Sequence, residues 1–273
     1  MNITTKNKEV IKKKKMQKKY FDFTGQVAIV TGCSTGLGVQ MAKALANQGC
    51  NIVATARRED LLKEVCNEIK NQYKVEAIPI KCDMGDTKMI KEMIEKVYNH
   101  FKRIDILINN AGIGSVTPAE KLTDEQFEKE MNIDLTGVFK CARECANIAM
   151  IPAKYGRIIN ISSMYGLVGN KETPSSAYQA AKGGVCNLTR ALAAEWAKYN
   201  ITVNSICPGY FWTPLTKETL DSESFKIYAK QAIPLERYGQ EGELDTTTLF
   251  LASKYSSYVT GTNIPVDGGY TCV

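Results

Sequence analysis

The sequence predicts an α/β protein built on one doubly wound parallel sheet, with helices on both faces and therefore three layers. Short apolar runs alternate with amphipathic helical stretches along most of the chain, and the connections between them are short. A glycine-rich segment, residues 31–38, directly follows the first apolar run. With 273 residues and 44% hydrophobic content, the chain can bury one large core. We therefore expect a single domain over residues 21–273.

The first predicted strand is a short, continuous apolar run, as is typical of a strand buried on both faces. In chain order, the predicted strands are residues 27–31, 51–55, 75–80, 104–108, 156–161, 202–206 and 262–266. Apolar residues at helical spacing predict the helices between and after them. These are residues 38–48, 60–72, 88–101, 124–150, 177–199 and 244–252.

The stretch from residue 208 to 237 is the longest without a regular pattern, and it is rich in Pro, Thr and Tyr. It follows a strand end, where sheets of this kind place their ligands. Loops of this length are uncommon without a role. We therefore predict a mobile substrate lid at about 208–237, with an ordinary surface loop as the alternative.

Residues 1–20 are predicted to form a basic, disordered extension. Residues 6–19 contain eight lysines and no long apolar run, so they match neither a signal peptide nor a membrane span. Such a tail can contact nucleic acid or an anionic membrane, but we favour a solvated extension. The charge after residue 20 is nearly balanced. We therefore expect no nucleic-acid or membrane partner for the folded body.

The nine cysteines form no CxxC pair, and His100 is the only histidine. A lone histidine cannot build a zinc site, and no partner pair or histidine cluster accompanies the cysteines, so no metal is expected. Cysteines without a disulfide pattern are typical of small buried side chains in a reducing compartment. A cytoplasmic location is therefore expected.

The glycine-rich segment predicts a nucleotide site. Gly32, Gly36 and Gly38 lie between a predicted strand and a predicted helix, the context that gives such glycines weight. They allow a tight turn and a close approach of the backbone to a pyrophosphate, which the N-terminus of the helix would stabilise.

The end of the second predicted strand bears on the cofactor. Ala56 stands where a carboxylate would hold a ribose 2′-hydroxyl, and Arg57 and Arg58 follow it. A guanidinium is well suited to bind a 2′-phosphate, so NADP(H) is favoured over NAD(H). Glu59 is the reason to keep NAD(H) as the alternative, because a shifted turn would bring its carboxylate to the ribose.

Tyr178 and Lys182 are four residues apart in a predicted helix and therefore share a face. An ammonium beside a phenol stabilises the phenolate, which makes Tyr178 a candidate general acid and base. Together with a nucleotide site, this pair indicates hydride chemistry.

Five motifs occur in the order found in the short-chain dehydrogenase/reductase family, which this chain resembles from residue 23 to its end. They are Thr31-Gly-x-x-x-Gly-x-Gly38, Asn109-Asn-Ala-Gly112, Ile161-Ser-Ser163, Tyr178-x-x-x-Lys182 and Pro208-Gly209. The resemblance implies a Rossmann-type fold, oxidation of CH–OH groups with NAD(P), and a homotetramer.

The resemblance also implies a role for each catalytic residue. Tyr178 would exchange the proton with the substrate oxygen, and Lys182 would support it and hold the nicotinamide ribose. Ser163, rather than its neighbour Ser162, would polarise the carbonyl. Ser163, Tyr178 and Tyr210 are the expected substrate contacts, and the hydride itself belongs to the nicotinamide.

Asp83 resembles the aspartate that contacts adenine in this family, and Thr213 lies in the segment that contacts the carboxamide. Asn109 and Ala111 lie at positions whose residues, in this family, lie behind the adenosine ribose and stabilise the sheet. The full set of expected cofactor contacts is Gly32, Ser34, Thr35, Gly36, Leu37, Gly38, Arg57, Arg58, Asp83, Met84, Asn110, Ala111, Gly112, Tyr178, Lys182, Pro208, Gly209 and Thr213.

Asp134 departs from the family pattern, which has an asparagine at this position. The asparagine supports, through its backbone carbonyl, a water that connects to the lysine. Because a carbonyl survives the change, Asp134 is included among the catalytic residues with the same backbone role.

Residues 195–201 and 208–214 resemble the sugar-acid branch of the family, which includes gluconate 5-dehydrogenase. The resemblance implies a small-molecule substrate, either a sugar acid or a polyol and its keto sugar. The alternatives are reduction of a 3-oxoacyl thioester on acyl carrier protein, and reduction of a steroid or another carbonyl compound. A non-catalytic role on the same fold is disfavoured by the intact set of Ser163, Tyr178 and Lys182.

Overall fold

The computed structural model describes residues 19–214 and 216–273. Its centre is a seven-stranded parallel sheet in the order β3-β2-β1-β4-β5-β6-β7, which confirms the predicted doubly wound fold. The strands are β1 Val27–Thr31, β2 Asn51–Ala56, β3 Ala77–Lys81, β4 Ile106–Asn109, β5 Gly156–Ile161, β6 Ile201–Pro208 and β7 Asn263–Val266. All seven predicted strands are present, with ends that shift by one or two residues.

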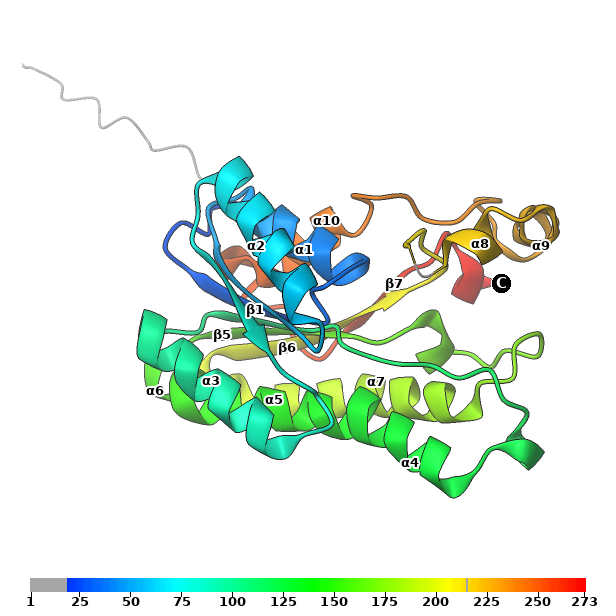
Figure 1. Cartoon of the computed structure of the whole chain (residues 1–273), viewed down its shortest axis with the longest axis horizontal. Coiled ribbons are helices and arrows are strands. Elements are labelled where there is room, and N and C mark those ends of the chain that lie inside the picture. Colours follow the sequence, from blue (N-terminus) through cyan, green and yellow to red (C-terminus); the bar gives the residue numbers. More distant parts are fainter. Residues whose placement is uncertain (1–18, 215) are drawn as a thin grey trace, which may run out of the picture.

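Helices cover both faces of the sheet, so the fold has three layers (Figure 1). One face carries α1 Leu37–Ala46, α2 Glu59–Tyr73 and α10 Asp245–Ala252. The other face carries α3 Thr87–Phe101, α4 Asp124–Met131, α5 Gly137–Cys145, α6 Ile151–Ala153 and α7 Ser176–Trp196. Each face has its own apolar core, because strands such as β1 point alternate side chains to opposite sides.

The order of the strands creates the site. β1 pairs with β2 on one side and with β4 on the other, so the connections that leave β1 and β4 diverge to opposite faces. A crevice forms at the carboxyl ends of the strands where the winding reverses, and ligands of such sheets bind there.

The long predicted helix at 124–150 is one continuous helical stretch that runs to Ala153. Thr123 and Gln126 form a capping box at its start. Two π-helical segments, Asn132–Thr136 and Ala146–Met150, interrupt the α-helix. Such wide turns are rare in proteins, but those that occur often lie at functional sites. The first of them contains Asp134.

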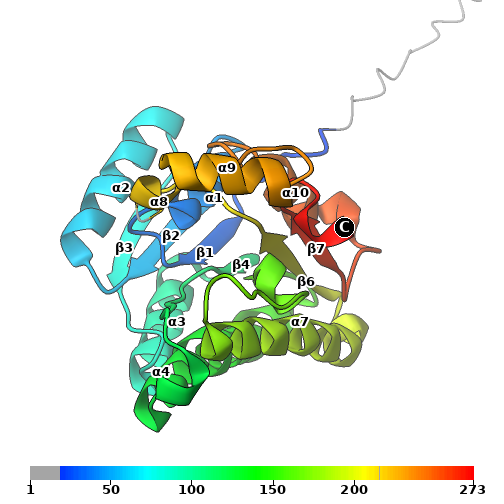
Figure 2. The same ribbon diagram turned by 90° about the vertical axis from the view of Figure 1, so that its right-hand side faces the viewer.

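The expectation of an irregular segment at 208–237 is wrong for much of its length, because α8 Lys217–Leu220 and α9 Glu223–Ala232 lie within it. The hydroxyl of Ser222 caps α9 by accepting a hydrogen bond from Phe225 N at 3.2 Å. Leu220 and Phe225 pack in a small third core with aromatic neighbours. Figure 2 shows both helices on the side of the molecule where the C-terminus lies. Movement of this lid remains a prediction.

Most of the predicted extension at 1–20 falls outside the described residues. Tyr20, at its predicted end, is docked on the fold, since its carbonyl accepts a hydrogen bond from Ser253 Oγ at 2.7 Å. The ring of Tyr20 also packs edge-on against Tyr255, with 5.2 Å between centroids. The folded body therefore includes Tyr20. Within residues 19–214 and 216–273, no helix combines the length and the apolar character needed to cross a bilayer.

All nine cysteines are free thiols, and eight of them are buried. Burial raises the pKa of the Cys66 thiol to about 11, as expected for an inert core side chain. The interpretation of the cysteines as buried hydrophobes is confirmed except at Cys272, which is exposed.

Candidate active site

A cleft of about 1020 Å³ lies at the carboxyl ends of the central strands. Its walls bring together the glycine-rich segment, the loop after β4, the end of β5, the start of α7 and the segment after β6. All the predicted cofactor and substrate residues line this cleft except Gly38. Asp134, predicted as catalytic, lies beneath the lining.

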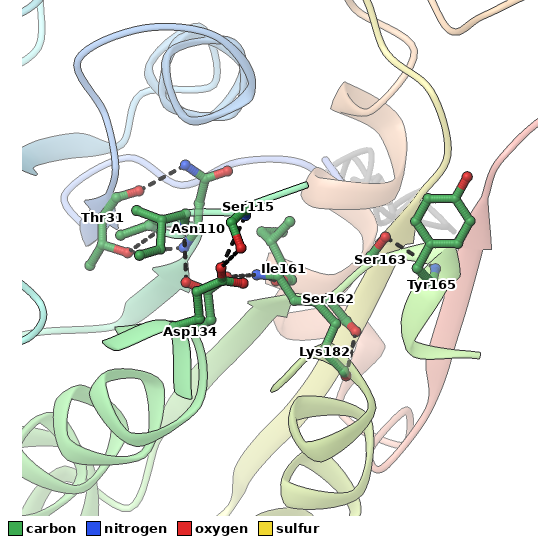
Figure 3. A network of polar contacts seen from close by, with 12 residues as sticks. Thr31, Asn110, Ser115, Asp134, Ile161, Ser162, Ser163, Tyr165 and Lys182 are labelled. Atoms are coloured by element: carbon green, nitrogen blue, oxygen red, sulfur yellow. Dashed lines mark hydrogen bonds and ion pairs between the residues drawn. The ribbon is translucent and has the colours of Figure 1, made fainter. Parts of the chain in front are cut away.

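Hydrogen bonds join the glycine-rich segment to the loop after β4 (Figure 3). Thr31 Oγ1 accepts hydrogen bonds from Asn110 N and Ala111 N, both at 2.9 Å, and Asn110 Nδ2 donates to Thr31 O at 2.9 Å. Gly32 has φ of +66°, and a Cβ there would lie 2.8 Å from Ala111 Cα. Only glycine fits such a position.

Gly38 serves packing instead of lining the cleft. A Cβ on Gly38 would lie 2.6 Å from both Gly32 O and Asn110 Nδ2. The glycine therefore lets α1 approach the end of β1 closely. No side chain caps the N-terminus of α1 at Gly36, which leaves the first N–H groups of the helix for a ligand.

The two arginines lie at the same end of the cleft as the glycine-rich segment. Arg58 Nη2 donates to Ser34 Oγ at 3.0 Å and to Thr35 Oγ1 at 3.1 Å, so its guanidinium lies over the turn that follows β1. Glu59 does not line the cleft; it pairs with Lys63 at 2.8 Å on the exposed side of α2. The geometry thus places cations, and no carboxylate from Glu59, beside the end of β2.

Asn109, which the family resemblance linked to the ribose and the sheet, is a buried sheet residue. Its Nδ2 donates to Asn160 Oδ1 on β5 at 2.9 Å, and it does not line the cleft. Asp83 does line the cleft, and its Oδ1 accepts a hydrogen bond from Gly85 N at 2.9 Å.

Tyr178 and Lys182 lie on one face of α7, as predicted, and both line the cleft. Lys182 Nζ is 5.5 Å from the centroid of the Tyr178 ring and donates to Ile161 O at 3.2 Å. A Cβ on Gly114 would lie 3.4 Å from Tyr178 Cδ2, so the loop after β4 packs against the ring. These contacts fix the phenol and the ammonium on the same wall.

The two serines after β5 have different surroundings. Ser162 Oγ donates to Lys182 O at 2.8 Å and does not have a free proton. Ser163 Oγ accepts a hydrogen bond from Tyr165 N at 3.1 Å, which leaves its own proton to donate into the cleft (Figure 3). The free proton of Ser163 favours it over Ser162 as the hydroxyl that polarises a carbonyl, and this role remains a prediction.

Asp134 contacts Lys182 through its side chain, which the expected backbone role did not anticipate. Its Oδ2 lies 3.2 Å from Lys182 Nζ, and its Oδ1 accepts a hydrogen bond from Ile113 N at 2.8 Å. Burial raises the pKa of the Asp134 carboxyl, and Glu130 acts in the same direction, whereas Lys182 and Ile113 N–H act against them. The residue is an ion-pair partner of the lysine.

Sequence reasoning missed Tyr165, which lines the cleft and lies two residues beyond Ser163 in the chain. Its hydroxyl is 2.5 Å from that of Tyr210, the predicted substrate contact. The Tyr210 hydroxyl also donates to Tyr228 Oη at 3.5 Å, and the Tyr228 and Tyr270 hydroxyls are 3.2 Å apart. The signal available was the position of Tyr165 directly after the serine motif.

A second cavity, of about 670 Å³, is lined by residues at the opposite ends of the strands, among them Gln26 and Asp105. Arg103 forms two 2.8 Å hydrogen bonds to the carboxylate of Asp105 there. Asp105 also accepts from Val27 N at 2.8 Å, so this ion pair anchors the start of β1. We assign it no catalytic part.

Comparison with known proteins agrees with this geometry. A family model described as enoyl-(acyl carrier protein) reductase matches residues 32–271. The 2-dehydro-3-deoxy-D-gluconate 5-dehydrogenase of Dickeya dadantii is 37% identical over 92% of this chain and 97% of its own length. The 3-oxoacyl-[acyl-carrier-protein] reductase of Aquifex aeolicus is 36% identical over 90% of this chain and 97% of its own length.

Among solved structures, a gluconate 5-dehydrogenase from Burkholderia cenocepacia, in complex with NADP and tartrate, aligns with a TM-score of 0.88. It is 32% identical, and the alignment covers 93% of this chain and 98% of that one. The family-model match runs from Gly32 in the glycine-rich segment, through Tyr178, to beyond the end of β7. The chain belongs to the short-chain dehydrogenase/reductase family and is an oxidoreductase that acts on alcohol or ketone groups.

Proposed function

We propose that this protein is an NADP(H)-dependent oxidoreductase that interconverts a secondary alcohol and a ketone on a polyol, a keto sugar or a sugar acid. The observation that carries the proposal is that one cleft is lined by both the expected catalytic residues and the expected cofactor residues. Ser163, Tyr178 and Lys182 share one end of it, while Arg57 and Arg58 lie with the glycine-rich segment at the other.

The residues of the cleft fit a dinucleotide. The uncapped N-terminus of α1 and the close-packed Gly32 suit a pyrophosphate, and the arginines suit a 2′-phosphate. The nicotinamide, when bound, supplies or accepts the hydride. During reduction, Tyr178 donates a proton to the carbonyl oxygen as Ser163 hydrogen-bonds to the same oxygen. Lys182 stabilises the phenolate that results.

The lining favours a neutral, hydroxylated substrate within the proposed class. Tyr165 and Tyr210 present phenol hydroxyls at the substrate end. Among the described lining residues, the cations are Arg57, Arg58 and Lys182, and the last of these is paired with Asp134. A sugar acid would thus find no further cation for its carboxylate, which favours a polyol and its keto sugar.

A substrate panel run with both NADPH and NADH tests the proposal. We expect the highest kcat/KM on neutral keto sugars with NADPH, lower values on 5-ketogluconate, and the lowest on acetoacetyl thioesters. The thioester arm is included because a relative at 36% identity is a 3-oxoacyl-[acyl-carrier-protein] reductase. Highest kcat/KM on the thioester would instead favour acyl-carrier reduction. No turnover of any ketone or alcohol would overturn the proposal.

We also expect the wider properties of the family in this protein. It should form a homotetramer, and it should be located in the cytoplasm. Light scattering after size exclusion measures the first, and fractionation of cells measures the second.

Replacing Arg58 with alanine should reduce the preference for NADPH. A hydrogen bond between charged groups contributes roughly 1.5–3 kcal/mol, so we expect the ratio of kcat/KM for NADPH to that for NADH to fall about 10- to 100-fold. Steady-state kinetics with both cofactors measures the ratio. Lys70→Ala, an exposed cation on α2 outside the cleft, is the matched control. An unchanged ratio in Arg58→Ala would remove the argument for its contact with a 2′-phosphate.

A further inference from the structure

A buried carboxylate, Asp134, contacts Lys182, and a second, Glu130, is buried one helical turn before it. Asp134 and Glu130 are 0% and 3% exposed, and Lys182 is 4% exposed. Glu130 and Asp134 are four residues apart, where α4 passes into the π-helical segment. Both α4 and this segment pack against α7, which carries Lys182. The close approach depends on Gly112, because a Cβ there would lie 2.8 Å from Asp134 Oδ2 and 3.2 Å from Lys182 Nζ.

Glu130 continues the cluster away from the lysine. Its Oε1 accepts hydrogen bonds from both the N–H and the hydroxyl of Ser115. Its Oε2 is buried without a hydrogen-bond partner among the described residues. Buried carboxylates are costly unless they are paired, so two of them with one ammonium form an electrostatically unbalanced group.

The charges that face each member are few. Lys182 faces Asp134, Tyr178 and, more weakly, the Cys186 thiol, while Asp134 faces Lys182 and Glu130. Burial by itself lowers the pKa of the Lys182 ammonium, but Asp134 and Tyr178 more than offset this and the pKa is raised. The ammonium therefore stays charged, with a carboxylate on one side and the phenol on the other.

We propose that Asp134, backed by Glu130, is a positioning residue that anchors Lys182 and offsets its charge, so that Tyr178 ionises at higher pH than it would beside an unopposed lysine. The inference rests on the proposed function, because it concerns the same proton exchange. A negative charge beside the ammonium weakens the field that stabilises the phenolate. The carboxylate thereby favours the protonated phenol, which is the form that donates a proton to a ketone.

The consequence concerns the direction of the reaction. Oxidation of an alcohol needs Tyr178 as a base, so its rate rises as the phenol ionises. With Asp134 in place, the rising limb of the pH profile for alcohol oxidation should lie at higher pH than in a protein that lacks this carboxylate. The rate of ketone reduction should in turn be kept to higher pH. The family pattern, which has an asparagine at this position, lacks this carboxylate.

Asp134→Asn tests the inference directly. We expect the midpoint of the rising limb of log(kcat/KM) for oxidation to move down by about one pH unit. A charge close to a titrating group shifts its ionisation by roughly one to three units, and Asp134 acts on Tyr178 through Lys182, so the low end of that range is expected. Glu130→Gln should move it in the same direction by less, because Glu130 acts through Asp134. Glu128→Gln, an exposed acid on the same helix, is the matched control and should leave the midpoint unchanged.

A second readout does not need turnover. The ultraviolet absorbance of tyrosinate is followed against pH for each variant and for the same variant carrying Tyr178→Phe, so that the difference isolates the phenol of Tyr178. We expect its transition to move down in Asp134→Asn and, by less, in Glu130→Gln. Near-ultraviolet circular dichroism identifies which variants are folded, and Glu130→Gln carries the test should Asp134→Asn not fold.

An unchanged or higher transition in a folded Asp134→Asn protein would overturn the inference, whether or not a substrate has been found. Absence of turnover in the wild-type protein on the whole substrate panel would instead count against the proposed function. The two failures are therefore distinguishable.

Discussion

Replacing Tyr178 with phenylalanine is expected to lower kcat by about 10²- to 10⁴-fold, the usual contribution of a general acid or base. The substitution removes one hydroxyl and keeps the ring that packs against Gly114. Affinity for NADPH should therefore change by less than about 3-fold, a difference below 0.7 kcal/mol. Stopped assays of turnover and a fluorescence titration with NADPH measure the two quantities.

Tyr73→Phe is the matched control, because Tyr73 ends α2 and does not line the cleft. It should keep both kcat and cofactor affinity. If Tyr178→Phe kept a kcat close to that of the wild-type protein, the proton transfer would have to be assigned to another group. If Tyr178→Phe lost NADPH binding instead, the main role of the phenol would be to bind the cofactor.

The fold could be predicted from the sequence because local pattern and global packing agree. The run Val27–Val30 is apolar throughout, and the whole of β1, Val27–Thr31, is buried. Gly32 lies where the chain needs a positive φ and a close contact, and its place between a predicted strand and a predicted helix indicated the turn. Tyr178 and Lys182 share a helix face as their spacing requires.

The part that escaped prediction depends on tertiary contacts. The spacing of side chains on a regular α-helix does not indicate a π-helical segment, and that segment is what places the Asp134 carboxylate beside Lys182. This direct ion pair is not part of the expected role of the Asp134 backbone carbonyl. Tyr165 was missed for a similar reason, because its meeting with Tyr210 joins segments 45 residues apart.

The helices of the predicted lid escaped prediction because they are short. α8 has 4 residues and α9 has 10, and helices of this length are marginal without packing. Their stability comes from Phe225 and Leu220 in the third core, which brings together residues from 210 to 270. A local signal was present in Ser222, which caps α9.

Replacing Lys182 with methionine is expected to destabilise the protein as well as inactivate it. The change leaves the Asp134 carboxylate at 0% exposure with Ile113 N–H as its remaining polar contact. Breaking a buried ion pair by removing one partner costs roughly 3–5 kcal/mol, and a domain of this kind has only about 5–15 kcal/mol of stability. Urea unfolding measures the loss, and no loss of stability would show that the ion pair contributes nothing to the fold.

The loss should depend on pH with a definite sign. Without the ammonium, burial raises the pKa of Asp134 above its value in the unfolded chain, and such a group favours the folded state only while it is protonated. Lys182→Met should therefore be least destabilised near about pH 4 and progressively more so as the pH rises toward neutrality.

Adding Asp134→Asn to Lys182→Met removes the buried charge and separates the two roles of the lysine. The double variant should recover most of the stability at neutral pH, because neither member of the pair is left charged and unpaired. It should stay inactive, because no ammonium remains to support the phenolate of Tyr178. Recovery of turnover together with stability would mean that Lys182 serves the fold alone. Recovery of stability without turnover would place its catalytic contribution in the charge that Asp134 offsets.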